Sequence, residues 1–267
     1  MAAAGGTAED KDLLAVLRLF AERAGKAILA NYLESTSYLE LERKPDGTPI
    51  TYADEASEEI LLAALETLTP GVPVYSEEQV YRQGAPQQVP GRFWLVDPLD
   101  GTEQYLAQNA EFTVNLALIE EGRPIAGVVH APALAMTWAG AGPGSAAFSQ
   151  TDHPPMAIAV RRPPDEGLVL FTHRYSDDGE SLRQARARHR IAKHHRSGGG
   201  LPYGFLASGK ADLYAFAASS HEWRSAAGQA LLQAAGGRVL ATDGTPLAYG
   251  KPKLVTRGFL AYGATEA

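Results

Sequence analysis

Apolar residues recur at helical spacing in two stretches near the start of the chain. This spacing predicts one helix over residues 10–32 and another over residues 54–68, where a Pro-Gly pair ends the pattern. Short apolar runs predict strands at 71–75 and 93–96. Two longer runs, separated by a Glu-Glu-Gly-Arg turn, predict a hairpin over 113–130 that continues into an antiparallel sheet.

The second half of the chain has a different pattern. A stretch rich in proline and polar residues, 151–164, marks a passage between two parts of the protein. Strand and helix patterns alternate beyond it, which is typical of an α/β layer. We therefore predict an N-terminal α+β half, residues 1–158, and a C-terminal α/β half, residues 159–267. The expected elements of the second half cover residues 167–171, 179–188, 203–208, 213–216, 223–235 and 238–241.

Composition and charge exclude several classes of protein. A formal net charge of −7 over 267 residues argues against a partner that is a nucleic acid polymer. Because the chain has no cysteine, disulfides and thiolate metal sites are ruled out. No apolar run approaches the ~20 residues of a membrane span, and residues 1–6 do not resemble a secretory signal. We expect a soluble cytoplasmic protein with no membrane partner.

The most informative segment follows the predicted strand 93–96. There Asp97 and Asp100 stand three residues apart with Pro98 between them, and Gly101 and Thr102 lead into a predicted helix. Two carboxylates delivered by a buried strand repel one another unless cations neutralise them. The free N–H groups of the helix start suit a phosphate. Carboxylates for a hard cation beside such amides indicate metal-assisted phosphate chemistry.

An Asp-Pro-x-Asp-Gly run taken alone is typical of a surface turn. Two further segments favour a functional site over that interpretation. The acidic pair Glu77-Glu78 follows another predicted strand, and the stretch from Lys44 to Asp54, with Pro45 and Asp46 in its turn, precedes a predicted helix.

Five motifs together resemble the inositol monophosphatase superfamily of Mg²⁺-dependent phosphatases, and within it the 3′(2′),5′-bisphosphate nucleotidases. In chain order they are Thr51-x-x-Asp54, Ser76-Glu77-Glu78, Trp94-x-x-Asp97-Pro98-Leu99-Asp100-Gly101-Thr102, Glu111-Phe112-Thr113-Val114-Asn115 and Glu222-Trp223-x-x-Ala226-Ala227-Gly228. The resemblance implies an αβαβα layered sandwich and a phosphomonoesterase that uses Mg²⁺ on a small phosphorylated substrate. Since dimers are common in the superfamily, a homodimer is the assembly that it suggests.

The resemblance also implies roles for the acidic residues. Glu77, Asp97 and the backbone carbonyl of Leu99 would hold a first Mg²⁺, whose bound water attacks the phosphate. Asp97 would bridge to a second Mg²⁺, also held by Asp100, which stabilises the leaving oxygen. Glu78 would support the catalytic site from the position next to Glu77.

Three further residues would act on the water and the phosphate. Thr102 and Asp54 would relay a proton away from the attacking water. The amides of Gly101 and Thr102 would bind the phosphate oxygens. The resemblance implies no covalent intermediate on the enzyme.

The chain departs from the superfamily pattern at three places, one of which is Ala207-Ser208-Gly209, where the nucleotidases have Ala-Glu-Gly. Members carry Trp-Asp where this chain has Trp223-Arg224, and that aspartate completes the second metal site. A guanidinium cannot ligate Mg²⁺, so Arg224 either replaces part of the metal's charge or contacts the substrate phosphate. The nucleotidase segment Gly-Ser-Ser-Leu-Lys-Phe is altered to Gly-Gly-Gly-Leu-Pro-Tyr at residues 198–203. Gly199 and Gly200 are candidate substrate contacts there, with a flexible turn as the alternative.

These departures leave three hypotheses open. The first is a working phosphomonoesterase, acting on bisphosphate nucleotides or on inositol, sugar or histidinol phosphates. The second is a catalytically impaired homologue that binds a phosphorylated ligand, and the third is an enzyme of altered chemistry on the same scaffold. The basic run at residues 183–196 favours an exposed helix and strand edge over a nucleic-acid site, and its histidines fit no compact metal-ligand set.

Overall fold

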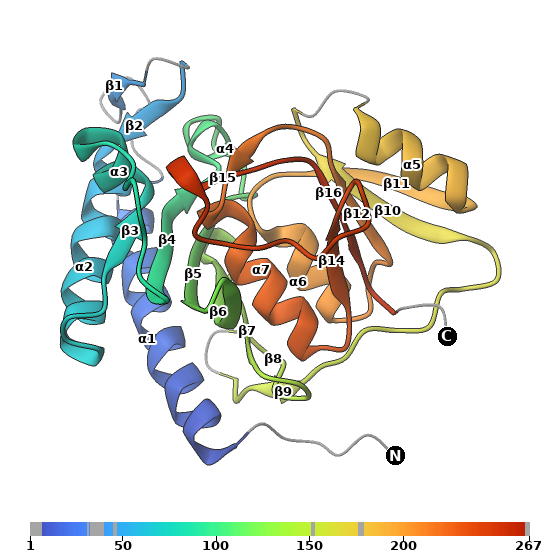
Figure 1. Ribbon diagram of the computed structural model, residues 1–267, viewed down its shortest axis with the longest axis horizontal. Helices are drawn as coiled ribbons and strands as arrows, with labels where there is room; N and C mark the ends of the chain where they lie inside the picture. The colour runs from blue at the N-terminus through green and yellow to red at the C-terminus, as the bar shows by residue number, and fades with distance from the viewer. Residues whose placement is uncertain are drawn as a thin grey trace.

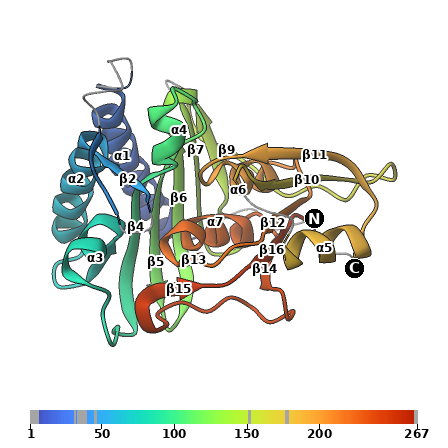
Figure 2. The ribbon, with the colours of Figure 1, turned by 90° about the horizontal axis from the view of Figure 1, so that it is seen from above.

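The computed structural model describes residues 7–30, 32, 40–44, 47–150, 153–175 and 179–264. The sequence features at residues 1–6, at Pro45 and Asp46 and at 151–152 lie outside these ranges. The elements stack as helix, sheet, helix, sheet and helix, so the predicted αβαβα sandwich is confirmed (Figure 2). No helix in the described ranges is both long and apolar enough to cross a membrane.

The first sheet has seven strands in the order β3-β4-β5-β6-β7-β8-β9, and only the β3–β4 pair is parallel (Figure 1). Helices α1 (Ala8–Ala30) and α2 (Tyr52–Leu68) cover its outer face. The strands are β3 (Val74–Ser76), β4 (Arg92–Asp100), β5 (Thr113–Glu120), β6 (Arg123–Ala131), β7 (Met136–Ala141), β8 (Ala147–Gln150) and β9 (Met156–Ala157). A small hairpin of β1 (Glu40–Arg43) and β2 (Pro49–Thr51) precedes α2.

Helices α6 (Leu201–Ala207) and α7 (Trp223–Ala234) lie between the two sheets and share an apolar core with both. The second sheet has the order β11-β10-β12-β16-β14, and α5 (Glu180–Arg188) covers its far side (Figure 2). Its strands are β10 (Leu168–His173), β11 (Ile191–Ser197), β12 (Leu213–Phe216), β14 (Arg238–Ala241) and β16 (Phe259–Tyr262).

The chain packs α7 unusually close to the first sheet. A Cβ atom at Gly127 in β6 would come within 2.5 Å of the Ala227 carbonyl oxygen on α7. On another side of α7, a Cβ atom at Gly228 would come within 2.2 Å of the Tyr203 ring in α6. Only glycine permits these approaches, which fix the position of α7 against its neighbours.

Most of the expected elements are present, and two strands, β4 and β16, differ from the prediction. Strand β4 does not end at Val96 but continues through a bulge, so that Asp97 pairs with Asn115 and Asp100 with Thr113. Strand β16, near the chain's end, was not expected, yet it pairs with β12 and β14. The basic run forms α5 and the exposed edge strand β11, which confirms the expected helix and strand edge.

Candidate active site

The bulged end of β4 places two aspartates in the protein interior. Asp97 and Asp100 are 1% and 6% exposed. Asp100 Oδ2 accepts a hydrogen bond from Asn115 Nδ2 at 3.0 Å, whereas neither oxygen of Asp97 has such a partner in the part of the chain that the structure describes. Burial raises the pKa of Asp100 to about 6, and burial with repulsion from Glu77 and Asp100 raises the pKa of Asp97 well above its ordinary value. Such a pair requires a nearby cation.

The first residues of helix α3 (Glu77–Gln83) bring a second acidic pair to the same place. Lys44 Nζ lies 2.7 Å from Glu77 Oε1 and 2.8 Å from Glu78 Oε1, and the Trp223 Nε1–H donates to Glu77 Oε2 at 2.7 Å. Burial alone would raise the pKa of Glu77, but Arg224 and Lys44 bring it down to about 2. Burial and repulsion from Glu77 raise the pKa of Glu78 to about 8. Lys44 is therefore a site residue, although the sequence analysis assigned it no role.

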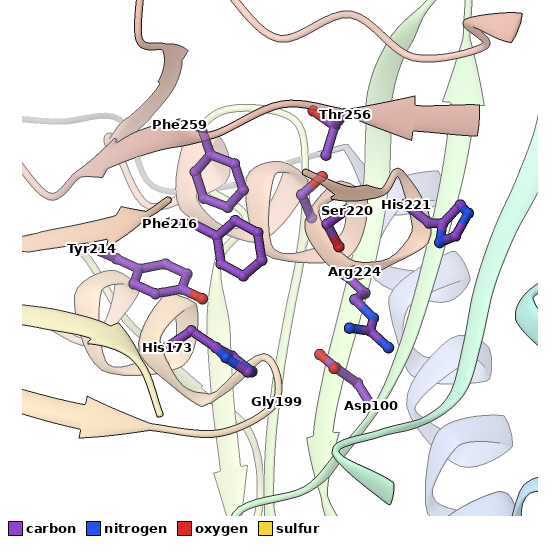
Figure 3. A pocket seen from close by; sticks show the side chains of 11 residues that line it. Asp100, His173, Gly199, Tyr214, Phe216, Ser220, His221, Arg224, Thr256 and Phe259 are labelled. Atoms are coloured by element: carbon purple, nitrogen blue, oxygen red, sulfur yellow. The ribbon is translucent and has the colours of Figure 1, made fainter. Parts of the chain in front are cut away.

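Arg224, in the first turn of α7, points into the acidic cluster. Its Nη2 lies 3.6 Å from Glu77 Oε1 and its Nε lies 3.8 Å from Asp97 Oδ2. Figure 3 shows the guanidinium facing Asp100 as well. The sequence analysis expected Arg224 at the predicted second metal site; the structure places it beside Glu77 as well, so this arginine borders both predicted metal-ligand sets.

Asp54 and Thr102 meet as the proton relay requires. A capping box at the start of α2 fixes Asp54, whose Oδ2 accepts from the Thr51 N–H at 2.8 Å and from Thr51 Oγ1 at 2.6 Å. Thr102 Oγ1 lies 3.2 Å from Asp54 Oδ1 and 3.2 Å from the Leu99 carbonyl oxygen. Burial raises the pKa of Asp54 to about 7. This carboxylate can therefore accept a proton near neutral pH.

Glycines shape the main chain around the acidic cluster. Gly101 has φ +107°, and a Cβ atom there would lie 2.9 Å from Gln104 Oε1, so this turn into α4 (Thr102–Leu106) requires glycine. Gly199 has φ +54°, and a Cβ atom there would come within 3.0 Å of the Asp100 carbonyl oxygen. The Gly200 N–H donates to Thr113 Oγ1 at 2.8 Å and is already engaged.

A small cavity of about 10 Å³ opens between Arg224, Asp100 and Gly199 (Figure 3). Aromatic side chains form its far wall, which the sequence analysis did not identify. They are Tyr214, Phe216, Phe259 and His173. Tyr214 and Phe216 alternate along a predicted strand, so their shared face was the one available signal. Burial, together with Arg224 and Arg174, lowers the pKa of His173 to about 4, so this ring is neutral at neutral pH.

The donor set suits a hard cation at one position better than at two. Among the residues described, no three acidic or histidine side chains are grouped as metal ligands. The predicted first set has two carboxylates, Glu77 and Asp97, and the Leu99 carbonyl, which waters can complete to the octahedron of Mg²⁺. The buried oxygens of Asp97, which accept no hydrogen bond from the residues described, fit that cation. At the predicted second set, Arg224 stands where a further carboxylate would be needed.

Comparison with known proteins assigns the family. The inositol monophosphatase family matches residues 9–264. The chain belongs to the inositol monophosphatase family. It is 39% identical over 235 residues to the 3′(2′),5′-bisphosphate nucleotidase CysQ of Salmonella typhimurium, covering 86% of this chain and 90% of that protein. The CysQ of Escherichia coli K12 is 37% identical over 232 residues, with the same coverage.

A solved structure agrees with this family assignment. The crystal structure of CysQ from Bacteroides thetaiotaomicron, a bacterial member of the family, superimposes with a TM-score of 0.78 at 28% identity, covering 96% of this chain and 98% of that one. The family and these relatives are phosphatases, so the chain is a phosphomonoesterase and the expected enzyme class is confirmed.

Proposed function

We propose that this enzyme is a Mg²⁺-dependent phosphatase of 3′(2′),5′-bisphosphate nucleotides. The relatives' names supply the substrate class. The observation that carries the proposed mechanism is the contact between Thr102 and Asp54, in a site where no group in the described ranges hydrogen-bonds with the buried carboxylate of Asp97. Hydrolysis of a phosphomonoester needs two parts. One is a base for the attacking water, and the other is a pair of carboxylates that can bind a cation.

Glu77, Asp97 and the Leu99 carbonyl would hold the metal. When bound, Mg²⁺ supplies positive charge that acidifies a water molecule and polarises the phosphate. Thr102 Oγ1 accepts the water's proton as its own proton passes to Asp54 Oδ1, and the raised pKa of Asp54 suits that role. Gly101 and Thr102 present their main-chain N–H groups to the phosphate oxygens. Glu78 keeps Lys44 in place beside Glu77.

Arg224 would supply the charge that a second metal ion provides in other members of the superfamily. A fixed guanidinium can stabilise the charge that develops on a transferring phosphoryl group. Its contacts with Glu77 and Asp97 keep it within reach of a phosphate held at Gly101. Gly199, on the lining of the small cavity beside Asp100, would contact the substrate, with Gly200 anchoring the turn through Thr113.

A second candidate rests on the two cations that already contact Glu77. Lys44 and Arg224 both lie close enough to balance the charge of this carboxylate, which would also suit a homologue that binds a phosphorylated ligand without hydrolysing it. The homodimer, the cytoplasmic location and the division of the chain after residue 158 stay predictions of the sequence.

The deciding experiment measures phosphate release with Mg²⁺ from adenosine 3′,5′-bisphosphate, inositol monophosphates, histidinol phosphate and sugar phosphates. The proposal expects turnover of the bisphosphate that EDTA abolishes. Release from another substrate alone would keep the mechanism and change the substrate class. No release from any of them, with retained binding of the bisphosphate, would establish the second candidate.

A further inference from the structure

Glu222 is a buried carboxylate directly before the two residues of α7 that lie beside Glu77. It is 0% exposed, and the sequence analysis noted it only as the first residue of a motif. The Trp223 Nε1–H donates to Glu77 Oε2 at 2.7 Å, and Arg224 Nη2 lies 3.6 Å from Glu77 Oε1. A residue that fixes the start of α7 therefore also fixes two groups beside a predicted metal ligand.

Both oxygens of the Glu222 side chain are bonded to a distant segment of the chain. Oε2 accepts from the Gly250 N–H at 2.7 Å, and Oε1 accepts from the Lys251 N–H at 3.1 Å. Lys251 Nζ lies 2.6 Å from the same Oε1. Two N–H groups and an ammonium offset the cost of burying this charge, and they confine the carboxylate to one orientation.

The main chain of Glu222 joins the same segment to α7. Its N–H donates to the Leu254 carbonyl oxygen at 2.8 Å, and its own carbonyl oxygen accepts from the Ser225 and Ala226 N–H groups at 3.1 and 3.0 Å. The side chain makes no cap hydrogen bond to α7. Glu222 thus begins the helix with its carbonyl group and holds residues 250–254 with its N–H and its carboxylate.

The backbone of residues 250–254 is strained. Lys253 and Leu254 have φ values of +63° and +51°, in the left-handed region that favours glycine. Strain of this kind persists only where the surrounding structure enforces it, and it gathers at functional sites. Glu222 enforces it from both ends of the segment, because its carboxylate holds Gly250 and its N–H holds Leu254.

A contribution to stability alone does not account for these contacts. The attraction within a buried ion pair often does no more than match the cost of removing its charges from water. Groups that contact a metal ligand from behind orient it, and losing one typically costs about 10- to 100-fold in metal affinity or activity. The Trp223 indole is such a group for Glu77, and Glu222 is its neighbour in the chain.

We propose that Glu222 is a positioning residue, a role that rests on the proposed function, in which Glu77 is a metal ligand. Its carboxylate fixes the first turn of α7, so that the Trp223 indole holds Glu77 in the orientation that binds the cation. Glu222 acts through Trp223, because its own oxygens are engaged by Gly250 and Lys251. Without those contacts the start of the helix turns, and the indole N–H leaves Glu77 Oε2.

The first test observes the indole N–H directly and needs no metal. The chain has three tryptophans, and the indoles of Trp94 and Trp138 donate to hydroxyl oxygens at 2.9 Å, which makes them internal references. In the ¹H–¹⁵N spectrum of the labelled full chain, Trp223→Phe identifies the Trp223 signal. We expect Glu222→Gln to shift this signal and to leave those of Trp94 and Trp138 in place.

The second test measures Mg²⁺ affinity by calorimetry without substrate. Every protein in this series carries Arg224→Gln, so that a displaced guanidinium cannot offset a change at Glu77. We expect Glu222→Gln to weaken Mg²⁺ binding at least about tenfold. Trp223→Phe should weaken it by a similar factor. Adding Glu222→Gln to Trp223→Phe should change little further, since both act on the same contact.

Asp212→Asn is the matched control. Asp212 is also a buried carboxylate, and it likewise accepts from a main-chain N–H, that of Val169 at 2.8 Å, and pairs with a cation, Arg161 at 2.7 Å. Its loss should lower the melting temperature but leave the Trp223 signal and the Mg²⁺ affinity unchanged.

Lys251→Gln decides the question if Glu222→Gln does not fold. It removes only the ammonium, from a partly exposed position, and should shift the Trp223 signal in the same direction by less. An unmoved Trp223 signal overturns the inference, and so does a moved signal with unchanged Mg²⁺ affinity. A chain that binds no Mg²⁺ before Glu222 is changed would contradict the proposed function instead. The indole spectrum would then decide alone whether Glu222 holds Trp223 on Glu77.

Discussion

The Thr102 hydroxyl joins two segments 48 residues apart, because it lies 3.2 Å from Asp54 Oδ1 on α2 while Thr102 itself begins α4. Both side chains are buried, and the capping box with Thr51 leaves Asp54 little freedom to move. The pair is therefore preorganised, and a proton transfer through it needs no rearrangement of either helix.

Removing this hydroxyl should impair turnover far more than binding. We expect Thr102→Ala to lower kcat by about 10²- to 10⁴-fold, the usual contribution of a positioned acid or base, with KM changed little. Steady-state phosphate release measures both constants. Thr102→Ser, which keeps a hydroxyl, should restore much of the activity. Thr67→Ala, which removes an exposed hydroxyl of α2, is the matched control, and a Thr102→Ala enzyme as fast as the parent would disprove the relay.

Asp97 should link metal binding to stability. In the parent, Mg²⁺ should raise the melting temperature, because a ligand that binds only the folded state stabilises it. Asp97→Asn should remove this response, and without metal it should melt no lower than the parent, since a repelled buried carboxylate is gone. Thermal melts with Mg²⁺ and with EDTA measure both effects. A full Mg²⁺ response in Asp97→Asn would show that this site assignment is wrong.

Arg224 should limit the number of metal ions. We expect one strong Mg²⁺ site in the parent by calorimetry, and a second in Arg224→Asp, with affinity at the second position raised at least about tenfold. Arg224→Gln removes the cation without adding a ligand, so it separates charge from coordination. Two strong sites in the unaltered enzyme would contradict this prediction.

The activity of Arg224→Asp then distinguishes the hypotheses left open by the sequence. A sharp rise on a bisphosphate nucleotide would show that the parent is an impaired nucleotidase. A fall would show that Arg224 binds the substrate phosphate.

A histidine far from the catalytic residues should make stability depend on pH. His130 in β6 is 6% exposed, its Nδ1 lies 2.9 Å from Thr137 Oγ1, and burial lowers its pKa to about 4. In the unfolded chain the imidazole of His130 takes up a proton near pH 6.5, its ordinary pKa. The stabilisation that the folded protein gains from keeping this ring neutral is therefore complete above pH 6.5 and is lost as the pH falls toward 4. The full loss is about 3 kcal/mol.

Urea melts of the parent and of His130→Gln between pH 4 and 7 test this. The difference in unfolding free energy between the two proteins should change over that window. His153→Gln, at an exposed position, should follow the parent. A constant difference between parent and His130→Gln would rule out the linkage.

The sequence predicted the layers because periodicity and turn residues are local properties. It predicted the Glu121-Gly122 turn of the hairpin, which the structure confirms between β5 and β6. It missed β16 because that short apolar stretch becomes a strand only by pairing with β12 and β14, which is a non-local effect. The bulge that carries β4 through Asp97 to Asp100 is also set by its partner strand rather than by local preference.

The candidate site also has a part that could be predicted from the sequence and a part that depends on non-local packing. Motif resemblance brought Asp54, Thr102, Glu77 and Asp97 to attention, and the structure places these residues together. Neither the Lys44 contacts nor the aromatic wall could be found this way. The Lys44 contacts depend on how the β1–β2 hairpin packs against the first sheet, and the aromatic wall depends on how the second sheet packs against it. Residue spacing along the chain does not encode these distances.

The close approach of α7 to Gly127 and Tyr203 has a consequence for mutational screens. Helix α7 contacts the backbone of β6 on one side and an aromatic ring on the other. It therefore has no room to shift locally and accommodate a larger side chain. A methyl group added at Gly127 or Gly228 should therefore displace α7 as a whole. The first turn of α7, which carries Arg224 and the Trp223 indole that donates a hydrogen bond to Glu77, would move with it. Variants at these buried glycines should therefore lose activity in a screen as variants of catalytic residues do. A survey that sorts positions by their distance from the phosphate would misclassify them.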